Sequence, residues 1–399
     1  MIELPLLLYT YLVTETLAPF FASLLILTTI LFLGRILPLF DFIINFGISL
    51  PDFIRLCAYM VPNLFLFAIP MASMLGVILC FTRMGNDNEL IALKAAGIGL
   101  YRMLPAVVFF AVCTSLLTGY FSTTLIPSGT IAMKKLFFQL AKEKIDKGLQ
   151  EKKFSDGLPD VVIYIDREDP DTGTWQGVYV ADSRDSSNPL TIVAEKGYLV
   201  ADMPNMLLTL QLDHGSIHQA KEERTQTIRF ASYRINLSLQ GPGMDDEEVA
   251  RSASNNEMTQ QEIRDYVKAH GRKSPASISR MIEYHLRLVL PGGCFILTIL
   301  GLPLALRTRP GQRSIGVPLG LIIFICYYIM LTTVKSFSET SPLPVAFTMW
   351  LPNIIFGIVT LYILRFANLE STLSLIDFCL RIIHRAQSML PRPGKKKNS

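Results

Sequence analysis

The chain has 399 residues, of which 50% are hydrophobic and 18% are charged, and 24 of them are Phe. With its positive mean hydropathy, this composition is typical of a membrane protein. The formal net charge of +4 is small and spread along the chain, which excludes a nucleic-acid-binding surface as the main function. The six cysteines lie in or beside apolar segments and form neither a disulfide framework nor a metal-ligand pattern.

The first third of the chain predicts three membrane spans. Residues 1–16 mix Leu and Tyr with Glu3 and Glu15, which indicates an interfacial helix along the membrane. They carry no basic region or small-residue cleavage site, so we expect them to be retained rather than removed as a signal peptide. Spans are expected over residues 17–38, 55–82 and 103–126, with a turn-rich loop over residues 39–51.

Between the second and third spans lies a polar segment, residues 83–102, which we call the insert. Asn86 and Glu89 have the spacing of a capping box, and Gly97 stands where a C′ glycine ends a helix. This pattern predicts a compact helix over residues 86–97, too short to cross a bilayer. The insert is either an ordinary connecting loop or a part on which another protein pushes.

After the third span the chain changes to β-rich runs. Five runs are expected, over residues 160–166, 174–182, 190–200, 206–213 and 226–239. Apolar residues alternate with polar ones as in half-buried strands; the inward positions are Leu208, Leu210, Leu212, Tyr233 and Ile235. The alternation slips between Phe230 and Tyr233, which predicts a bulge or bend near Ala231. With turns expected at residues 169–171, 203–205 and 213–215, these runs predict an antiparallel sandwich or jelly roll.

The rest of the chain repeats the membrane pattern. Gly-Pro-Gly at residues 241–243 ends the β domain, and Thr259, Glu262 and Gly271 mark a short capped helix. Spans four to six are expected over residues 282–306, 315–334 and 343–366, with a basic turn at 307–313. The expected architecture is therefore an α-helical membrane protein with six spans (3+3) and an inserted all-β, jelly-roll-like domain. Its parts are residues 1–126, residues 127–279 with the β domain and a polar linker, residues 280–367, and a basic tail over 368–399.

The positive-inside bias gives an orientation. One set of loops holds the insert with Arg83, Lys94 and Arg102, together with the basic turn and the tail. We expect this side and both termini in the cytoplasm, and the β domain outside, in the periplasm of a diderm bacterium.

Motifs for catalysis are missing from the sequence. We find no G-x-x-x-x-G-K-[ST] loop, no H-E-x-x-H and no G-x-S-x-G, and the five histidines are scattered. The spans hold almost no carboxylates, which argues against a proton relay or a lipid-modifying enzyme. We therefore expect a transmitter or conduit, without enzymatic activity, cofactor or metal.

Two local phrases carry a resemblance to a known family. They are Asn88-Glu89-Leu90-Ile91-Ala92-Leu93-Lys94-Ala95-Ala96-Gly97-Ile98 in the insert, and Gly301-Leu302-Pro303-Leu304 followed by Arg307 and Arg313. With the 3+3 plan, they resemble the LptF/LptG permeases of the ABC transporter that exports lipopolysaccharide. The first span of that family usually starts R-Y-x-x-R-E-T, and residues 9–16 here lack both arginines. The first-span pattern favours the LptF member.

The resemblance implies that the insert holds a coupling helix that docks on an ATPase. The candidate coupling residues are Asp87, Glu89, Leu90, Leu93 and Lys94. The candidate contacts to lipid phosphates are Arg35, Lys134, Lys135 and Lys335, for which ordinary snorkelling to the interface is the alternative. The inward positions Leu208, Leu210, Leu212, Tyr233 and Ile235 are expected to form a slide for lipid chains.

The resemblance also implies partners. These are a cytoplasmic ABC ATPase (an LptB-like dimer), a homologous second permease (LptG-like), a single-span periplasmic bridge protein (LptC-like), lipopolysaccharide and membrane lipids, and no nucleic acid. The expected function is extraction of lipopolysaccharide from the inner membrane and its transfer to the β domain, driven by the separate ATPase. The alternative is a membrane-anchored periplasmic adaptor that transmits force or binds partners without moving lipid.

Overall fold

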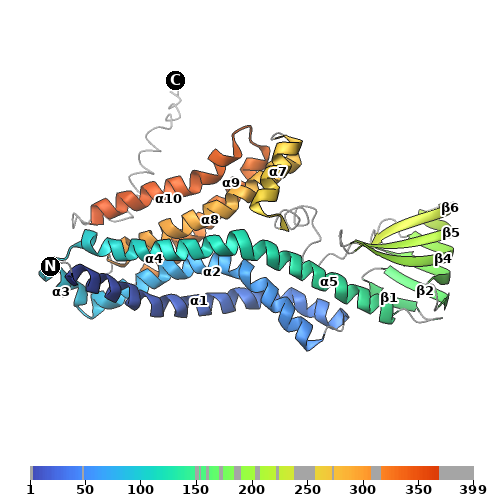
Figure 1. Cartoon of the computed structure of the whole chain (residues 1–399), viewed down its shortest axis with the longest axis horizontal. Helices are drawn as coiled ribbons and strands as arrows, with labels where there is room; N and C mark the ends of the chain where they lie inside the picture. Colours follow the sequence, from blue (N-terminus) through green and yellow to red (C-terminus); the bar gives the residue numbers. More distant parts are fainter. Residues whose placement is uncertain are drawn as a thin grey trace, which may run out of the picture. The chain divides into compact units, whose positions relative to one another are not determined.

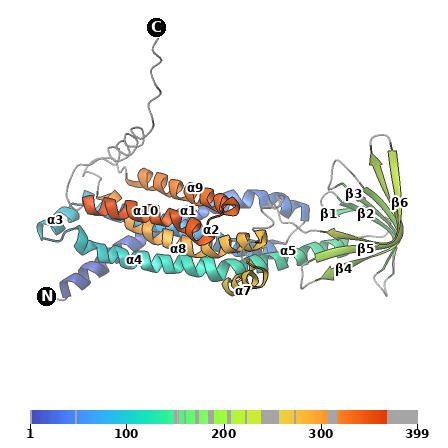
Figure 2. The ribbon, with the colours of Figure 1, turned by 90° about the horizontal axis from the view of Figure 1, so that it is seen from above.

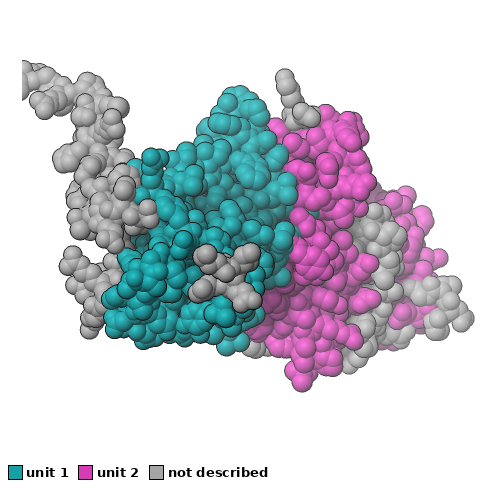
Figure 3. Space-filling model, turned by 60° about the vertical axis from the view of Figure 1, so that its left-hand side comes forward, with its two compact units in different colours: residues 1–27, 67–119, 285–399 teal, residues 28–66, 120–284 magenta. Residues whose placement is uncertain are grey.

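The computed structural model describes residues 3–46, 49–148, 152, 154–158, 161–169, 174–183, 190–202, 207–221, 224–237, 257–271, 274–306 and 316–367. The predicted Gly-Pro-Gly boundary, the basic turn and the tail lie outside these residues. The chain divides into two compact units, shown in separate colours in Figure 3. Unit 1 comprises Met1–Leu27, Phe67–Gly119 and His285–Ser399, and unit 2 comprises Thr28–Leu66 and Tyr120–Tyr284.

The six predicted spans are confirmed, since six helices are long and apolar enough to cross a membrane. Figures 1 and 2 show these helices from two directions. They are α1 (Glu3–Phe46), α2 (Leu50–Asn86), α4 (Leu100–Tyr120) with its continuation α5 (Ile126–Gly148), α8 (Pro275–Ala305), α9 (Gly316–Thr340) and α10 (Val345–Ala367). The short capped helix is also confirmed as α7 (Gln260–His270), with both capping-box hydrogen bonds between Thr259 and Glu262 present.

The helices run further than the sequence predicted. The interfacial segment and the first span form one helix of 44 residues, and the part of the predicted loop over residues 39–46 continues it. That stretch holds no glycine, and a proline such as Pro38 is tolerated in a membrane helix when neighbouring groups satisfy the freed carbonyl. The third span likewise passes through a π-helical turn, η1 (Phe121–Leu125), into α5. Strong helix formers after residue 131 extend α5 where the β domain was expected to begin.

Within unit 1, α2 and α8 pack closely through small residues. A Cβ at Gly301 would lie 2.9 Å from the Met74 carbonyl oxygen and 3.2 Å from Val77 Cβ. Nearby, the hydroxyls of Ser73 and Thr298 share a hydrogen bond of 2.7 Å between two buried side chains. Close packing and interhelical hydrogen bonds are the forces that hold helices together in lipid, because lipid removes most of the hydrophobic drive. This contact therefore holds α2 and α8 together within unit 1.

The inserted domain of unit 2 is one antiparallel sheet of six described strands in the order β1-β2-β3-β4-β5-β6. Its strands are β1 (Phe154–Leu158), β2 (Val161–Glu168), β3 (Trp175–Asp182), β4 (Leu190–Asp202), β5 (Leu207–Lys221) and β6 (Arg224–Leu237). The all-β insertion is confirmed, and β2 to β6 correspond to the five predicted runs. The described strands form a meander, a simpler order than the Greek-key crossings of a double-sheet jelly roll. The turn predicted at residues 213–215 is wrong, because β5 runs through it.

A line of missing ladder pairs crosses the sheet, and we call it the crease. It consists of Asp166, Gly177, Glu195, His214 and Ala231, which occupy neighbouring positions on β2 to β6. The register on either side is unchanged, so no residue is inserted. Gly177 and His214 have positive φ values of 64° and 54°. The bend predicted near Ala231 is confirmed as one end of this crease.

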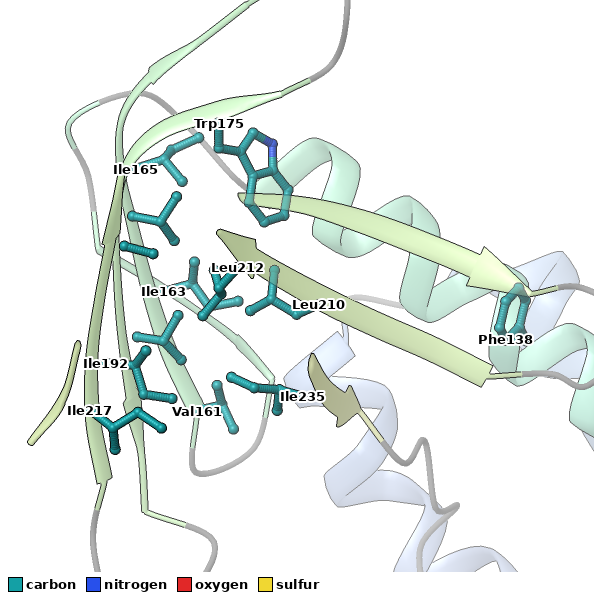
Figure 4. Close-up of a cluster of buried hydrophobic side chains, with 13 residues drawn as sticks. Phe138, Val161, Ile163, Ile165, Trp175, Ile192, Leu210, Leu212, Ile217 and Ile235 are labelled. Atoms are coloured by element: carbon teal, nitrogen blue, oxygen red, sulfur yellow. The ribbon is translucent and has the colours of Figure 1, made fainter. Parts of the chain in front are cut away.

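At the crease, the set of alternate side chains that faces the core changes from one face of each strand to the other. In β3 the buried side chains are Trp175 on one side and Val178 on the other, and in β5 they are Leu212 and Ile217. An odd separation of core residues is impossible in a regular strand, whose side chains alternate with period two. The sheet therefore bends at the crease, and its two halves face a common core of buried side chains (Figure 4).

The α2–α8 contact predicts a packing defect on substitution. Gly301→Val should lower the thermal stability of the detergent-solubilised protein, because overpacking a tight contact costs about 1–3 kcal/mol. Gly34→Val is the control, since nothing lies within 4 Å of a Cβ at that position. Equal melting temperatures for the two variants would show that α2 and α8 are not closely packed.

Candidate functional site

The helix of the insert, α3 (Glu89–Ala95), is shorter than predicted and begins differently. The capping box at Asn86 is wrong, because Asn86 is still part of α2 and an N-cap residue needs a non-helical backbone. Asn88 precedes α3 instead, with a left-handed backbone (φ 62°) and no side-chain capping bond. Asn is among the few residues that adopt this conformation readily, so it makes the sharp turn from α2 into α3.

The predicted end of the helix is confirmed. Gly97 has a φ of 79°. Its N–H donates to the Lys94 carbonyl at 3.0 Å, and the Ile98 N–H donates to the Leu93 carbonyl at 2.9 Å. These two bonds define a Schellman motif, which satisfies the last carbonyls of the helix. Lys94 lies in the last turn, where a cation interacts favourably with the helix dipole.

The apolar residues of α3 differ in exposure. Leu90 is buried within this chain at 7% exposure, and Leu93 is half-buried. Ile91, which is not among the predicted coupling residues, is 54% exposed. Leu90 and Ile91 belong to the same apolar run, so spacing alone could not tell which of them faces away from the chain. Asp87 and Lys94 are exposed beside this surface.

Four polar side chains connect the start of α1 to the turn between α2 and α3, and we call them the junction cluster. The Tyr11 hydroxyl donates a hydrogen bond of 2.7 Å to Oε2 of Glu89, the first residue of α3. One turn further along α1, Glu15 accepts a hydrogen bond from Nη2 of Arg83 and forms an ion pair with it. Tyr11 and Glu15 lie 78 and 68 positions from their partners, so spacing could not reveal either contact.

Beneath the junction cluster, α1 packs firmly on α2. Leu12, Thr16 and Phe20 follow one another at intervals of four residues and are at most 4% exposed. A Cβ at Gly76 of α2 would lie 3.0 Å from the Phe20 backbone. The first turns of α1 are therefore fixed against α2.

The candidate basic residues have different surroundings. Lys134 on α5 forms an ion pair with Glu257, whereas Lys135 beside it is exposed. Arg35 on α1 is exposed and Lys335 on α9 is half-buried. Neither Arg35 nor Lys335 has an ion-pair partner among the described residues. Arg35 belongs to unit 2 and Lys335 to unit 1.

The β domain encloses a core of buried apolar side chains (Figure 4). Three of the predicted inward residues, Leu210, Leu212 and Ile235, lie in it, and Tyr233 packs against it. Leu208 belongs to β5, but its side chain is not among those that the structure describes. The other members of this core, which the alternation along β5 and β6 could not reveal, are Phe138, Val161, Ile163, Ile165, Trp175, Val178, Val180, Ile192, Ala194 and Ile217.

No group of three or more His, Cys, Asp or Glu side chains among the described residues has the arrangement of a metal site. Unit 1 holds a helix-bearing insert between two spans and its junction to the first span, and unit 2 holds an apolar β core. With six helices able to cross a membrane, these features define a multi-pass membrane protein with an inserted β domain.

The chain belongs to the lipopolysaccharide export system permease LptF/LptG family, whose model matches residues 10–365. The resemblance carried by the sequence is thereby confirmed. The family is the permease component of the lipopolysaccharide export transporter, and its members are multi-pass proteins of the inner membrane.

Two relatives illustrate the similarity. The chain is 21% identical over 360 residues to the lipopolysaccharide export system permease protein LptF of Escherichia coli K12, covering 87% of this chain and 91% of the relative. It is 23% identical over 311 residues to an uncharacterised protein of Rickettsia prowazekii, covering 78% of this chain and 84% of the relative.

Proposed function

We propose that the chain is the LptF-type permease subunit of an ABC transporter that extracts lipopolysaccharide from the inner membrane and passes it to the β domain. The observation that carries the proposal is the insert. It places a short helix, ended by a Schellman motif, between two membrane spans, and it exposes Ile91 and Lys94 on this helix and Asp87 just before it. In this proposal a cytoplasmic ATPase binds that surface, and a homologous second permease completes the membrane part.

The energetics of lipid extraction require such a drive. Each buried CH₂ group is worth about 0.8 kcal/mol, so exposing several acyl chains of roughly a dozen carbons costs on the order of tens of kcal/mol. Transport therefore needs both ATP-driven force and an apolar path. The insert is suited to receive the force, and the apolar interior of the β domain is suited to continue the path, with a single-span bridge protein beyond it.

The orientation follows from charge. Arg83, Lys94 and Arg102 flank or belong to the insert, and the positive-inside bias puts such loops in the cytoplasm. The β domain then lies in the periplasm and both termini in the cytoplasm.

The insert generates the first test. Purified from its native cell, the chain should be recovered with a cytoplasmic ATPase whose hydrolysis of ATP is stimulated by lipopolysaccharide. Glu89→Ala should lower the amount of lipid transported per ATP by about tenfold, since the loss of a hydrogen bond to a charged group changes an equilibrium constant by about that factor. The measurement is release of lipopolysaccharide from proteoliposomes together with phosphate production.

The control is Glu339→Ala, which removes an exposed carboxylate near the end of α9. Normal transport by Glu89→Ala would remove the coupling role of Glu89. Purification with periplasmic partners but without an ATPase or lipid-stimulated hydrolysis would favour the alternative, an adaptor that transmits force without moving lipid.

Arg35 and Lys335 are proposed contacts to the lipid phosphates, with Lys135 as a weaker candidate. Lys134 would first have to leave Glu257. Charge reversal, Arg35→Glu or Lys335→Glu, should reduce the stimulation of ATP hydrolysis by lipopolysaccharide several-fold, since charge-assisted bonds to phosphate are among the strong ones. Arg365→Glu, in the last turn of α10, is the control. Unchanged stimulation in both variants would favour snorkelling as the role of these residues.

The β interior is proposed as the lipid slide, formed by Leu208, Leu210, Leu212, Tyr233 and Ile235. A photoreactive amino acid at Leu210 or Tyr233 should crosslink to lipopolysaccharide only when ATP is supplied. The same probe at exposed Arg234 is the control. Equal labelling at the control, or no labelling at any inward position, would show that lipid does not pass through the β core.

A further inference from the structure

The junction cluster (Tyr11, Glu15, Arg83 and Glu89) brackets a single turn of the chain. Arg83 lies in the last turn of α2, and Glu89 is the first residue of α3. Between them lies Asn88, whose left-handed backbone interrupts the helix. Tyr11 bonds to Glu89, which follows this turn, and Glu15 bonds to Arg83, which precedes it. Helix α1 therefore contacts the chain both before and after the point at which α3 could pivot.

Both contacts are exposed to solvent. The side chains of Arg83 and Glu15 are 51% and 29% exposed, and Tyr11 is 38% exposed, so neither contact is strong by itself. Both hydrogen bonds are charge-assisted, because each has a carboxylate acceptor. Because Glu89 begins α3 and Arg83 lies in the last turn of α2, we expect Tyr11 to hold α3 and Glu15 to set the direction of α1 relative to the end of α2.

The segment of α1 that carries these side chains has a rigid base. Its neighbouring face, formed by Leu12, Thr16 and Phe20, is buried. The same helix continues beyond this base without interruption to Phe46. A displacement of α3 that preserves the Tyr11–Glu89 bond must therefore displace the first turns of α1, and with them the first membrane span.

We propose that Tyr11 and Glu15 are positioning residues that fasten α3 to α1, so that movement imposed on α3 reaches the first span directly as well as through α2. This inference rests on the proposed function for the source of the movement. It assigns a role to the N-terminal turns of α1, which the sequence described only as an interfacial helix. Glu89 keeps its second carboxylate oxygen for an external partner.

The hydroxyl of Tyr11 provides the first test. In the assembled complex, Tyr11→Phe should lower lipopolysaccharide transport per ATP by roughly tenfold with hydrolysis maintained, because only the bond to a charged acceptor is removed. The matched control is Tyr9→Phe, a half-buried tyrosine on the same helix whose ratio should stay within about twofold of the wild type.

A charge exchange provides the second test. Glu15→Arg and Arg83→Glu should each lower the same ratio, and the double variant should restore it to within about twofold, as expected for two side chains that act as a pair. If the single variants transport less lipopolysaccharide per ATP and the double variant does not recover, the role of Glu15 is overturned. If Tyr11→Phe and Tyr9→Phe transport equal amounts of lipopolysaccharide per ATP, the role of Tyr11 is overturned.

Hydrogen exchange separates this inference from the proposed function. In the purified chain without ATPase, Tyr11→Phe should accelerate amide exchange over Glu89–Ala95, whereas Tyr9→Phe should not. Unchanged exchange in Tyr11→Phe would overturn the fastening of α3 to α1. If the wild-type chain does not associate with an ATPase but Tyr11→Phe still accelerates exchange over Glu89–Ala95, the proposed function fails while the Tyr11–Glu89 contact is supported.

Discussion

The close approach of α2 and α8 is the contact on which unit 1 depends. Inside a bilayer the burial of apolar side chains contributes little to the association of helices. Close backbone packing and interhelical hydrogen bonds must therefore stabilise it. Gly301 permits the approach and the Ser73–Thr298 bond fixes its register. Helix α1 is attached to the same α2 through Gly76 and Phe20. The insert is thus the continuation of a helix that is anchored to both α1 and α8 by close contacts at residues 73–77.

This arrangement fixes the direction of α3 within the insert. A helix of seven residues joined by a left-handed turn would not by itself hold a fixed direction. Its end is closed by the Schellman motif at Gly97, and its start is held by Tyr11 from α1. Both ends of α3 are therefore defined by hydrogen bonds, while Ile91 is left on the outer surface. Such a helix is suited to be a docking element, because little ordering remains to be done on binding.

The sequence predicted the six spans, the β insertion and the end of α3, because hydropathy, alternation and C′ glycines act over a few residues. It failed where a local signal competed with its surroundings. Asn86 has the spacing of a cap, but α2 continues through it. Residues 39–46 carry turn-like neighbours, but they extend α1. The contacts of Tyr11 and Glu15 could not be predicted, since they join segments far apart in the chain and are set by the packing of α1 on α2.

The crease changes how the β domain should be probed. Because the inward phase inverts at His214 while the register is kept, the rule that every second residue faces inward holds only within each half of a strand. A scan of alternate residues along β5 that starts at Leu210 samples the interior before His214 and the surface after it. Labelling that stops abruptly beyond residue 214 would therefore reflect the geometry of the strand, and the scan must move to Ile217 to follow the same wall.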